Sequence, residues 1–211
     1  MYKSATASLD ELVRIAKGKL TENSAIPKIG WLPVINTDTL RSRNKLWAEP
    51  LGSTLCQKND VLILWDGERS GLCAFGYEGV LGSTFSRISV IDSEELDPEY
   101  LYRFLDWKFL WIQNQRTGTG VPHVPKNLGK LLQVRYPGIW YQKKIAKILS
   151  TCDEVLEKTE AAIAKYEAIK KGLMHDLFTR GIDLKTGELR PKYEDAPELY
   201  KESELGMIPK E

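Results

Sequence analysis

The sequence has few of the side chains that usually carry chemistry in enzymes. It holds only three cysteines and two histidines among 211 residues. The cysteines are odd in number and none stands in a Cys-x-x-Cys pair, so the sequence predicts neither a disulfide framework nor a zinc site. We expect Cys56, Cys73 and Cys152 to be buried and to act as small apolar residues.

Long apolar runs are also missing. No stretch approaches the roughly 18 apolar residues of a membrane span, and the first 14 residues lack the basic and then apolar order of a signal peptide. We therefore expect a cytoplasmic protein. With 42% hydrophobic and 28% charged residues, the chain has an ordinary soluble composition, and its length favours one or two domains.

Motifs for catalysis or for cofactor binding are absent too. The sequence contains no Gly-x-x-x-x-Gly-Lys-Ser/Thr loop, no Gly-x-Ser-x-Gly elbow and no His-Glu-x-x-His helix. Asp66 and Glu68 resemble half of a nuclease metal site, but no further carboxylate or lysine follows at a suitable spacing, and a turn explains them better. We expect no catalytic residues, no metal and no cofactor, which leaves binding as the function.

The most distinctive segment is a predicted helix of 35 to 40 residues, from about Tyr141 to Arg180, which contains no proline. Its apolar residues recur at a heptad-like spacing and form one wide stripe. The columns of that stripe are Ile145, Cys152, Thr159, Tyr166 and Leu173; Ile148, Val155, Ala162 and Ile169; and Leu149, Leu156, Ile163 and Leu177. A head of this size cannot cover so long a stripe, so we expect it to pair with a second helix as a coiled coil. An ordinary core helix is the alternative.

Charge is distributed unevenly along the chain, although the formal net charge is only +1. No acidic residue lies between Trp107 and Cys152. The basic residues of that segment are Lys108, Arg116, Lys126, Lys130, Arg135, Lys143, Lys144 and Lys147. Such a local excess of positive charge suits phosphate groups, and the Gly/Thr loop from Arg116 to Asn127 adds exposed backbone donors. The segment from Asp183 to Glu211 is acidic instead.

The part before the long helix is predicted to be β-rich. The apolar run Val61–Leu64 has the length of a buried strand, and Leu72–Tyr77 and Phe85–Ile91 are predicted to be further strands. The segment Pro27–Val34 has short extended character. We therefore predict an α+β fold, with a globular β-rich head.

Two further helices are expected in this head. Leu9–Ala16 has apolar residues at helical spacing, and Gly18 follows as its C-cap. Asp97 suits the N-cap and Pro98 the first turn of a second helix, which we expect to continue to about Gln115.

Several segments in this order resemble the DNA-specificity (S) subunits of type I restriction-modification enzymes. The segments that carry the resemblance are Leu9–Ile15, Lys58–Ile63, Asp97–Tyr102, Gly120–Leu128, Gln142–Leu149 with Asp153, and Leu173–Gly181. Each is weak alone, but together they cover nearly the whole chain. Lys58–Asp60 lacks the family's usual glycine, and Pro137–Trp140 stands where the family often has two prolines, so the geometry of that junction is in doubt.

The resemblance implies a target-recognition domain in residues 1–140, a long coiled-coil helix in 141–181, and a linker or the start of a next repeat in 182–211. The segment Ser203–Pro209 is similar to the opening of a second recognition domain, and nothing equivalent precedes Leu9. We therefore expect half of a subunit, either naturally short or cut at the repeat boundary.

Such a half would read part of a DNA target and would dock methyltransferase subunits, and through them the restriction subunit. Catalysis would belong to those partners. Two copies would pair through antiparallel long helices, which hold two heads at a fixed spacing and select a palindromic site.

The predicted DNA contacts are basic residues in or near loops, where arginine suits guanine edges and lysine suits phosphates. They are Arg41, Arg43, Lys45, Arg69, Arg87, Arg116 and Lys126. Two alternatives remain open. A coiled-coil adapter would show no salt-dependent DNA affinity, and a nuclease or methyltransferase would show activity that depends on a cofactor or metal.

Overall fold

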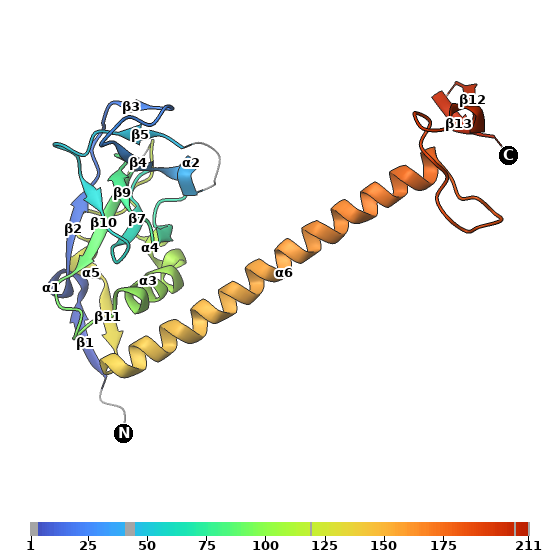
Figure 1. Cartoon of the computed structure of the whole chain (residues 1–211). Helices are drawn as coiled ribbons and strands as arrows, with labels where there is room; N and C mark the ends of the chain where they lie inside the picture. Colours follow the sequence, from blue (N-terminus) through green and yellow to red (C-terminus); the bar gives the residue numbers. More distant parts are fainter. Residues whose placement is uncertain (1–3, 41–44, 119, 205, 211) are drawn as a thin grey trace. The chain divides into compact units, whose positions relative to one another are not determined.

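A computed structural model describes residues 4–40, 45–118, 120–204 and 206–210 of the protein (Figure 1). The chain forms two compact units, one ending at Ser150 and one beginning at Thr151. Helix α6, Ile139–Thr179, contributes residues to both units. The fold is α+β, as the sequence predicts. No helix in the described ranges is long and apolar enough to cross a membrane.

An antiparallel sheet forms the centre of the head, the unit that ends at Ser150. Its order is β2-β10-β7-β8, with β2 Val13–Lys17, β10 Phe85–Val90, β7 Val61–Leu64 and β8 Cys73–Ala74. The side chains of β7 alternate between two core clusters: Val61 and Ile63 face one, and Leu62 and Leu64 face the other. Because both faces of β7 are covered, all of its residues are apolar, and the predicted buried strand is confirmed.

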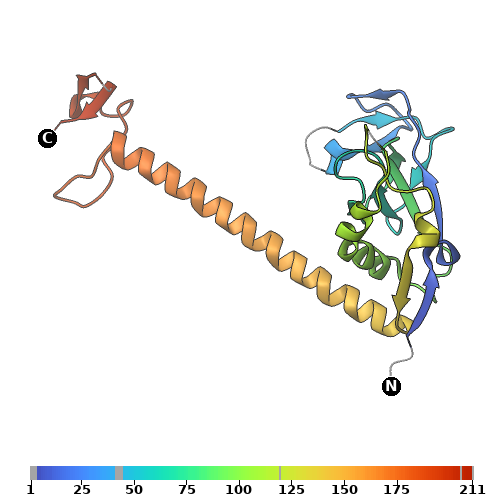
Figure 2. The same cartoon turned by 180° about the vertical axis from the view of Figure 1, so that it is seen from behind.

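A second sheet packs beside the first. Its order is β3-β5-β4-β9-β6, with β3 Asn23–Ser24, β5 Trp47–Ala48, β4 Leu32–Ile35, β9 Gly79–Leu81 and β6 Leu55–Cys56. The β4–β9 pair is parallel and the other neighbours are antiparallel. A separate antiparallel pair, β1 Ala5–Ser8 with β11 Gln133–Tyr136, lies where α6 begins (Figure 2).

The predicted helix at residues 9–16 is wrong beyond its first turn. Helix α1 spans only Leu9–Leu12, and the chain then continues as β2. Strand β2 pairs with β10, which places Val13 opposite Val90 and Ile15 opposite Ile88. Gly18 is not a helix C-cap, because it lies against the backbone of Gly82, where a Cβ would come 2.1 Å from the carbonyl oxygen.

The aromatic helix begins as predicted but is interrupted. Asp97 accepts a hydrogen bond from the backbone N–H of Tyr100 at 2.9 Å, and α3 spans Pro98–Trp107. At Lys108 the backbone turns, and α4, Phe109–Asn114, continues in a new direction. This turn allows Ile112 to be fully buried against Gly71. The prediction of one uninterrupted helix to about Gln115 is therefore wrong. Helix α5, Leu128–Leu131, then leads into β11.

Helix α6 confirms the long helix, with 41 residues and a length of about 60 Å at 1.5 Å per residue. Its large apolar residues from Ile145 to Leu177 are between 39% and 70% exposed in the single chain. Cys152 is exposed on this helix, so the expectation that all three cysteines are buried is wrong for this one. Cys56 and Cys73 are buried as expected.

The first turns of α6 are anchored to the head by the buried side chain of Gln142. Its Oε1 accepts the backbone N–H of Asp97, and its Nε2 donates to the carbonyls of Glu95 and Pro137, each at 2.8 Å. Tyr136 adds a hydrogen bond of 2.5 Å from its hydroxyl to the carboxylate of Glu95, which raises the pKa of Tyr136 to about 12. Residues 139–150 lie within the head unit, whereas the predicted helical segment begins at residue 141.

The second unit continues after the helix with a 3₁₀ turn and a hairpin. These elements are η1 Pro197–Leu199, β12 Tyr200–Ser203 and β13 Gly206–Pro209. Arg180 donates from Nε to the carbonyl of Arg190 at 2.7 Å, and Tyr200 donates from its hydroxyl to the carbonyl of Pro191 at 2.5 Å. The segment after α6 is therefore folded against the end of the helix.

Replacing Gln142 by Met, which has a similar volume but no amide, is expected to lower the free energy of unfolding by about 2–4 kcal/mol. The reason is that three backbone groups lose their partner, at about 1 kcal/mol or more each. Urea denaturation followed by tryptophan fluorescence measures the change. The matched control is Lys143→Ala at the exposed neighbouring position, where a change within about 0.5 kcal/mol is expected. Equal stability of the two variants would contradict the anchoring role.

Candidate nucleic-acid interface

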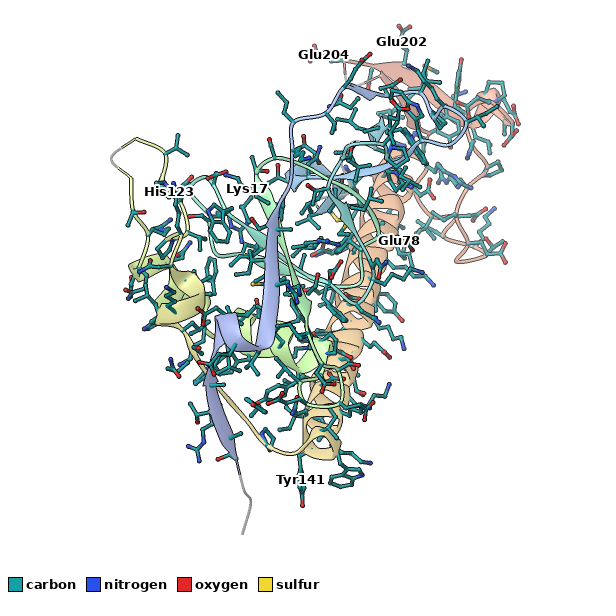
Figure 3. All side chains as sticks on the ribbon, turned by 90° about the vertical axis from the view of Figure 1, so that its left-hand side faces the viewer. Lys17, Glu78, His123, Tyr141, Glu202 and Glu204 are labelled. Carbon is teal, nitrogen blue, oxygen red and sulfur yellow. The ribbon has the colours of Figure 1, made fainter. Side chains whose placement is uncertain are left out.

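Two loops are joined side by side at one end of the head. The loop after β7, residues 65–72, meets the loop after α4, residues 115–127. The backbone N–H of Gly67 donates to the carbonyl of Pro122 at 2.8 Å, and that of Val124 donates to Trp65 at 2.9 Å. In Figure 3, His123 and Lys17 lie toward this end of the head, and Tyr141 lies at the opposite end, where α6 begins.

Arg116 holds these two loops together. Its Nε donates to the carbonyl of Gln113 at 2.9 Å, and its Nη1 donates to the carbonyl of Glu68 at 2.5 Å. Two of its donors are thus used within the protein. Arg116 therefore fixes the position of the loop that carries Glu68 and Arg69.

The second loop closes on itself between Thr117 and His123. Their backbone groups exchange hydrogen bonds at 3.1 and 2.9 Å, and the Thr117 hydroxyl lies 3.0 Å from Nε2 of His123. Gly118 lies within this closure with a φ of +106°, and a Cβ there would come 2.7 Å from the carbonyl oxygen of Val121. The loop thus requires glycine at this position.

A third segment reaches the same end of the head. The Asn36 side chain accepts the backbone N–H groups of Asp38 and Thr39, at 3.0 and 2.9 Å, and caps the short helix α2, Thr37–Leu40. A hollow of about 380 Å³ separates α2 from the loop after β7, and Arg69 lines it. Helix α2 and the loop after β7 thus line one concave, partly polar hollow.

One acidic residue of this surface is paired with a lysine. Asp66 makes an ion pair of 2.8 Å with Lys17, which belongs to β2. Among the described residues, no group of three or more histidine, cysteine or acidic side chains is placed to hold a metal ion. Burial raises the pKa of the Cys56 thiol to about 11 and also raises that of Cys73, so neither thiol is a nucleophile at neutral pH.

The predicted contact residues fall into different settings. Arg69 and Lys126 are exposed on the joined loops, and Lys45 is exposed beside the segment that leads to β5. Within the described ranges, none of these three side chains makes a hydrogen bond or an ion pair with the protein. Arg41 and Arg43 lie outside the described residues.

Arg87 is not gathered with the others. It lies on β10 and makes an ion pair of 3.8 Å with the buried carboxylate of Asp60, which also accepts the Ser89 hydroxyl at 2.5 Å. Asp60 precedes β7, whereas the joined loops follow that strand. Arg87 therefore lies beside the start of β7, away from the loops that carry Arg69 and Lys126.

Sequence reasoning did not single out Lys17, Asn36 and Gln142, which shape the site or its support. Asn36 stands one residue before a Thr-Asp-Thr turn, which is a recognisable capping signal. Gln142 is a polar residue one turn before the buried Ala146, a pattern that indicates a buried hydrogen-bonding side chain. Lys17 has no local signal, because its partner Asp66 is distant in the sequence.

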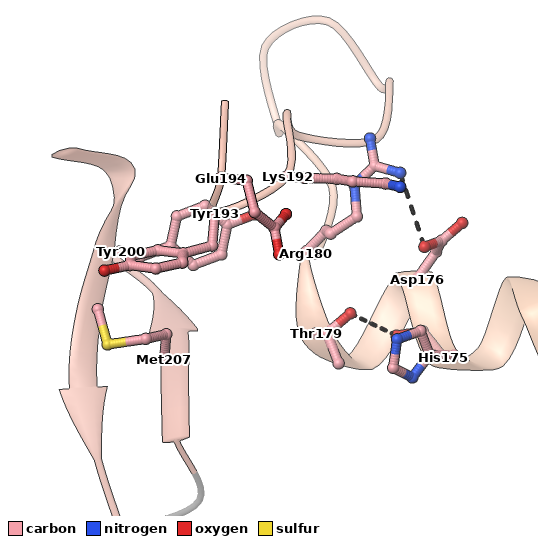
Figure 4. A pocket seen from close by; sticks show the side chains of 9 residues that line it. All are labelled: His175, Asp176, Thr179, Arg180, Lys192, Tyr193, Glu194, Tyr200 and Met207. Atoms are coloured by element: carbon pink, nitrogen blue, oxygen red, sulfur yellow. Dashed lines mark hydrogen bonds and ion pairs between the residues drawn. The ribbon is translucent and has the colours of Figure 1, made fainter. Parts of the chain in front are cut away.

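A separate hollow of about 280 Å³ lies in the second unit (Figure 4). Its walls are the last turns of α6, the segment after it and the terminal hairpin. Asp176 makes an ion pair of 3.6 Å with Arg180, and the Thr179 hydroxyl donates to the carbonyl of His175 at 2.7 Å. Both contacts lie at the end of the helix itself, and they provide no pair of side chains suited to acid–base or nucleophilic chemistry.

Comparison with protein families gives one match that covers most of the chain. Residues 2–166 match the family described as type I restriction modification DNA specificity domain. The type I restriction enzyme MjaVIII specificity subunit of Methanocaldococcus jannaschii is 30% identical over 206 residues, which is 96% of this chain and 45% of that protein. The chain thus spans about half the length of this relative.

Solved structures share the fold. The S subunit of a type I restriction-modification system from M. genitalium aligns with a TM-score of 0.63 and 20% identity, over 84% of this chain and 46% of that one. A chain from work on complex assembly and conformational transition of the type I R-M system aligns with a TM-score of 0.60 and 16% identity, over 81% of this chain and 43% of that one.

Replacing Gly118 by Ala is expected to loosen the loop closure, because alanine cannot adopt this φ without strain of about 1–3 kcal/mol and its Cβ would collide with Val121. Hydrogen exchange of the Thr117 and His123 backbone amides should become faster. Gly120→Ala is the matched control, since a Cβ there meets nothing within 4 Å. If both variants exchange at the wild-type rate, the requirement for glycine at position 118 is wrong.

Proposed function

The chain belongs to the type I restriction-modification DNA specificity domain family, and on that premise we propose that its head reads one part of a DNA target. The observation that carries the proposal is the group of joined loops on which Arg69 and Lys126 are exposed. Charged side chains held on a rigid loop can contact phosphates and base edges without first being ordered. The chain would act as a specificity subunit, or part of one, without catalytic activity of its own.

Two features support DNA as the ligand of this surface. The side chains of Arg69 and Lys126 are exposed on the joined loops, where they can meet a ligand without breaking a contact within the protein. The nearby carboxylate of Asp66 is neutralised by Lys17, which removes a charge that would repel phosphate. We assign Lys45, Arg69 and Lys126 to DNA contact and keep Arg41 and Arg43 as further candidates. Arg116 we assign to loop positioning.

We further propose that two copies pair through α6 in an antiparallel coiled coil. The support is the apolar stripe from Ile145 to Leu177, which is left in water by the single chain. An antiparallel pair holds two reading heads at a spacing set by the helix length, so the bound site would be a palindrome interrupted by a spacer. A coiled-coil adapter that does not bind DNA is the second candidate, favoured by the same stripe.

Methyl transfer and cleavage would belong to partner subunits of a type I restriction-modification system. The absence of catalytic motifs in the sequence supports this division of labour. We propose that methyltransferase subunits dock on the chain, that the restriction subunit associates through them, and that the assembly is cytoplasmic and needs no cofactor on this chain.

The DNA proposal predicts that Arg69→Ala and Lys126→Ala each weaken binding to duplex DNA in the presence of the methyltransferase subunits. A lost phosphate contact lowers affinity for every sequence and reduces the slope of log K against log salt by about 1. A lost base contact costs about 1–3 kcal/mol and relaxes specificity at one position. Fluorescence anisotropy on cognate and random duplexes at several salt concentrations distinguishes these effects.

Lys58→Ala is the control for this experiment, because Lys58 is exposed at the opposite end of β7 from the joined loops. Its binding curve should overlay that of the wild type. If the chain bound no duplex DNA in the presence of the partner subunits, or if its DNA affinity did not depend on salt, the coiled-coil adapter would be favoured.

The dimer proposal predicts that the chain sediments at twice its mass of 24.0 kDa. Combining Leu156→Asp with Ile163→Asp should give a monomer with an intact head, because two carboxylates would be buried in the seam without partners. Analytical ultracentrifugation measures the mass. Lys158→Asp, on the polar face of the same helix, is the control and should remain dimeric, whereas a monomeric wild type would contradict the proposal.

A further inference from the structure

The loop after β7 contains a tight turn, residues 67–70, that exposes two charged side chains. The carbonyl of Gly67 accepts the backbone N–H of Ser70 at 3.0 Å, so Glu68 and Arg69 occupy the two central positions of the turn. Gly67 has a φ of +110°, and Ser70 is fully buried. The two ends of the turn are therefore fixed, while the side chains of Glu68 and Arg69 are exposed.

Contacts with the loop after α4 also hold this turn in place. The backbone N–H of Gly67 donates to the carbonyl of Pro122 at 2.8 Å, and Nη1 of Arg116 donates to the carbonyl of Glu68 at 2.5 Å. The side chain of Glu68 thus extends from a backbone that is held on both sides. A ligand that meets this side chain does not have to order the loop first.

The carboxylate of Glu68 is free, in contrast to that of its neighbour Asp66. Asp66 makes an ion pair of 2.8 Å with Lys17. Within the part of the chain that the structure describes, the Glu68 side chain has no hydrogen-bond or ion-pair partner. Glu68 lines the same hollow as Arg69. A free carboxylate on a DNA-binding surface repels phosphates, so it lowers the affinity unless a hydrogen-bond donor of the DNA meets it.

We propose that Glu68 is a specificity-determining residue, which accepts a hydrogen bond from the N4 amino group of a cytosine in the major groove. Acidic side chains pair with cytosine N4 in this groove. Adenine also presents an amino group there, but its N7 acceptor lies beside it and would face the carboxylate. This inference rests on the DNA reading proposed above, and it names one base that the joined loops would select.

The same carboxylate would reject the other bases. Guanine presents N7 and O6 to the major groove, and thymine presents O4; all three are acceptors. An acceptor that faces a carboxylate leaves both groups without a donor, which costs binding energy. Arg69, at the next position of the turn, offsets the negative charge of Glu68, so the turn can still approach the phosphates.

Selection from a randomised duplex library tests the assignment. The full chain is mixed with the library in the presence of the methyltransferase subunits, and the bound duplexes are sequenced. The wild type should enrich cytosine at one position, and Glu68→Gln should lose that preference while the other positions stay unchanged. Because glutamine pairs with N6 and N7 of adenine, we expect adenine to be enriched at that position instead.

Glu94→Gln is the matched control, because it removes the same charge from another part of the head. Glu94 is exposed after β10, and it lines a hollow with Asn59 and Lys143 near the start of α6. The joined loops lie at the other end of the head. Glu94→Gln should therefore select the same sequence as the wild type.

The outcomes separate this inference from the proposed DNA reading. If the wild type binds no duplex, both fail. If the wild type selects a sequence and Glu68→Gln selects the same one, with equal or higher affinity, the carboxylate does not read a base and only the assignment of Glu68 is wrong. A change at a position where the wild type selects another base would refute cytosine as the ligand.

A modified duplex tests the hydrogen bond itself. In a Watson–Crick pair, the methyl group of N4-methylcytosine replaces the N4 hydrogen that faces the major groove. This base at the selected position should weaken binding by the wild type about tenfold. It should not affect Glu68→Ala, in which the contact is already lost. Fluorescence anisotropy at one salt concentration measures the four affinities, and an equal loss for both proteins would contradict the inference.

Discussion

The apolar stripe of α6 is the constraint on which the rest of the protein depends. Its large apolar side chains, from Ile145 to Leu177, lie on one long helix, and each is more than a third exposed when the chain is alone. At about 25 cal/mol per Å² of apolar surface removed from water, covering such a stripe is a strong drive for association. A stripe of this length matches another helix of the same length better than it matches any short segment. This match leads to the proposal that two copies pair, and that the pairing sets the distance between two reading heads.

The proposed pairing requires that the first turns of α6 are fixed to the head. The Gln142 side chain anchors these turns, because it hydrogen bonds to the backbone of Glu95, Asp97 and Pro137 while fully buried. The joined loops lie at the other end of the head from this anchor (Figure 3). Between them, the central sheet with β7 buried on both faces provides a stiff connection. The joined loops, the central sheet and the first turns of α6 therefore belong to one compact unit.

The sequence predicts those parts of the fold whose signals are local. The apolar run of β7, the Asp97 cap and the heptad stripe each identify an element without knowledge of its neighbours. Residues 9–16 were predicted wrongly, because the spacing of their apolar residues fits a helix. Val13 and Ile15 are in a strand because they pair with β10, which is distant in the sequence. The candidate site is harder to predict from the sequence, because it also depends on contacts between distant residues. Basic residues can be found from the sequence, but only the structure places Arg116 on the carbonyls of Gln113 and Glu68 and places Arg87 on Asp60.

The exposed cysteine on α6 allows the pairing to be measured without any substitution. Cys56 and Cys73 are buried, so a spin label would react with Cys152, and double electron–electron resonance would report the distance between the two labels in a dimer. In an antiparallel pair centred on Thr159, each Cys152 lies opposite Tyr166 of the other helix, so the labels should be about 20–25 Å apart at 1.5 Å per residue. A parallel pair would bring the labels to about 10 Å, the spacing of packed helices, and would contradict antiparallel pairing. A sample that shows no dipolar coupling between two labels would contradict pairing altogether.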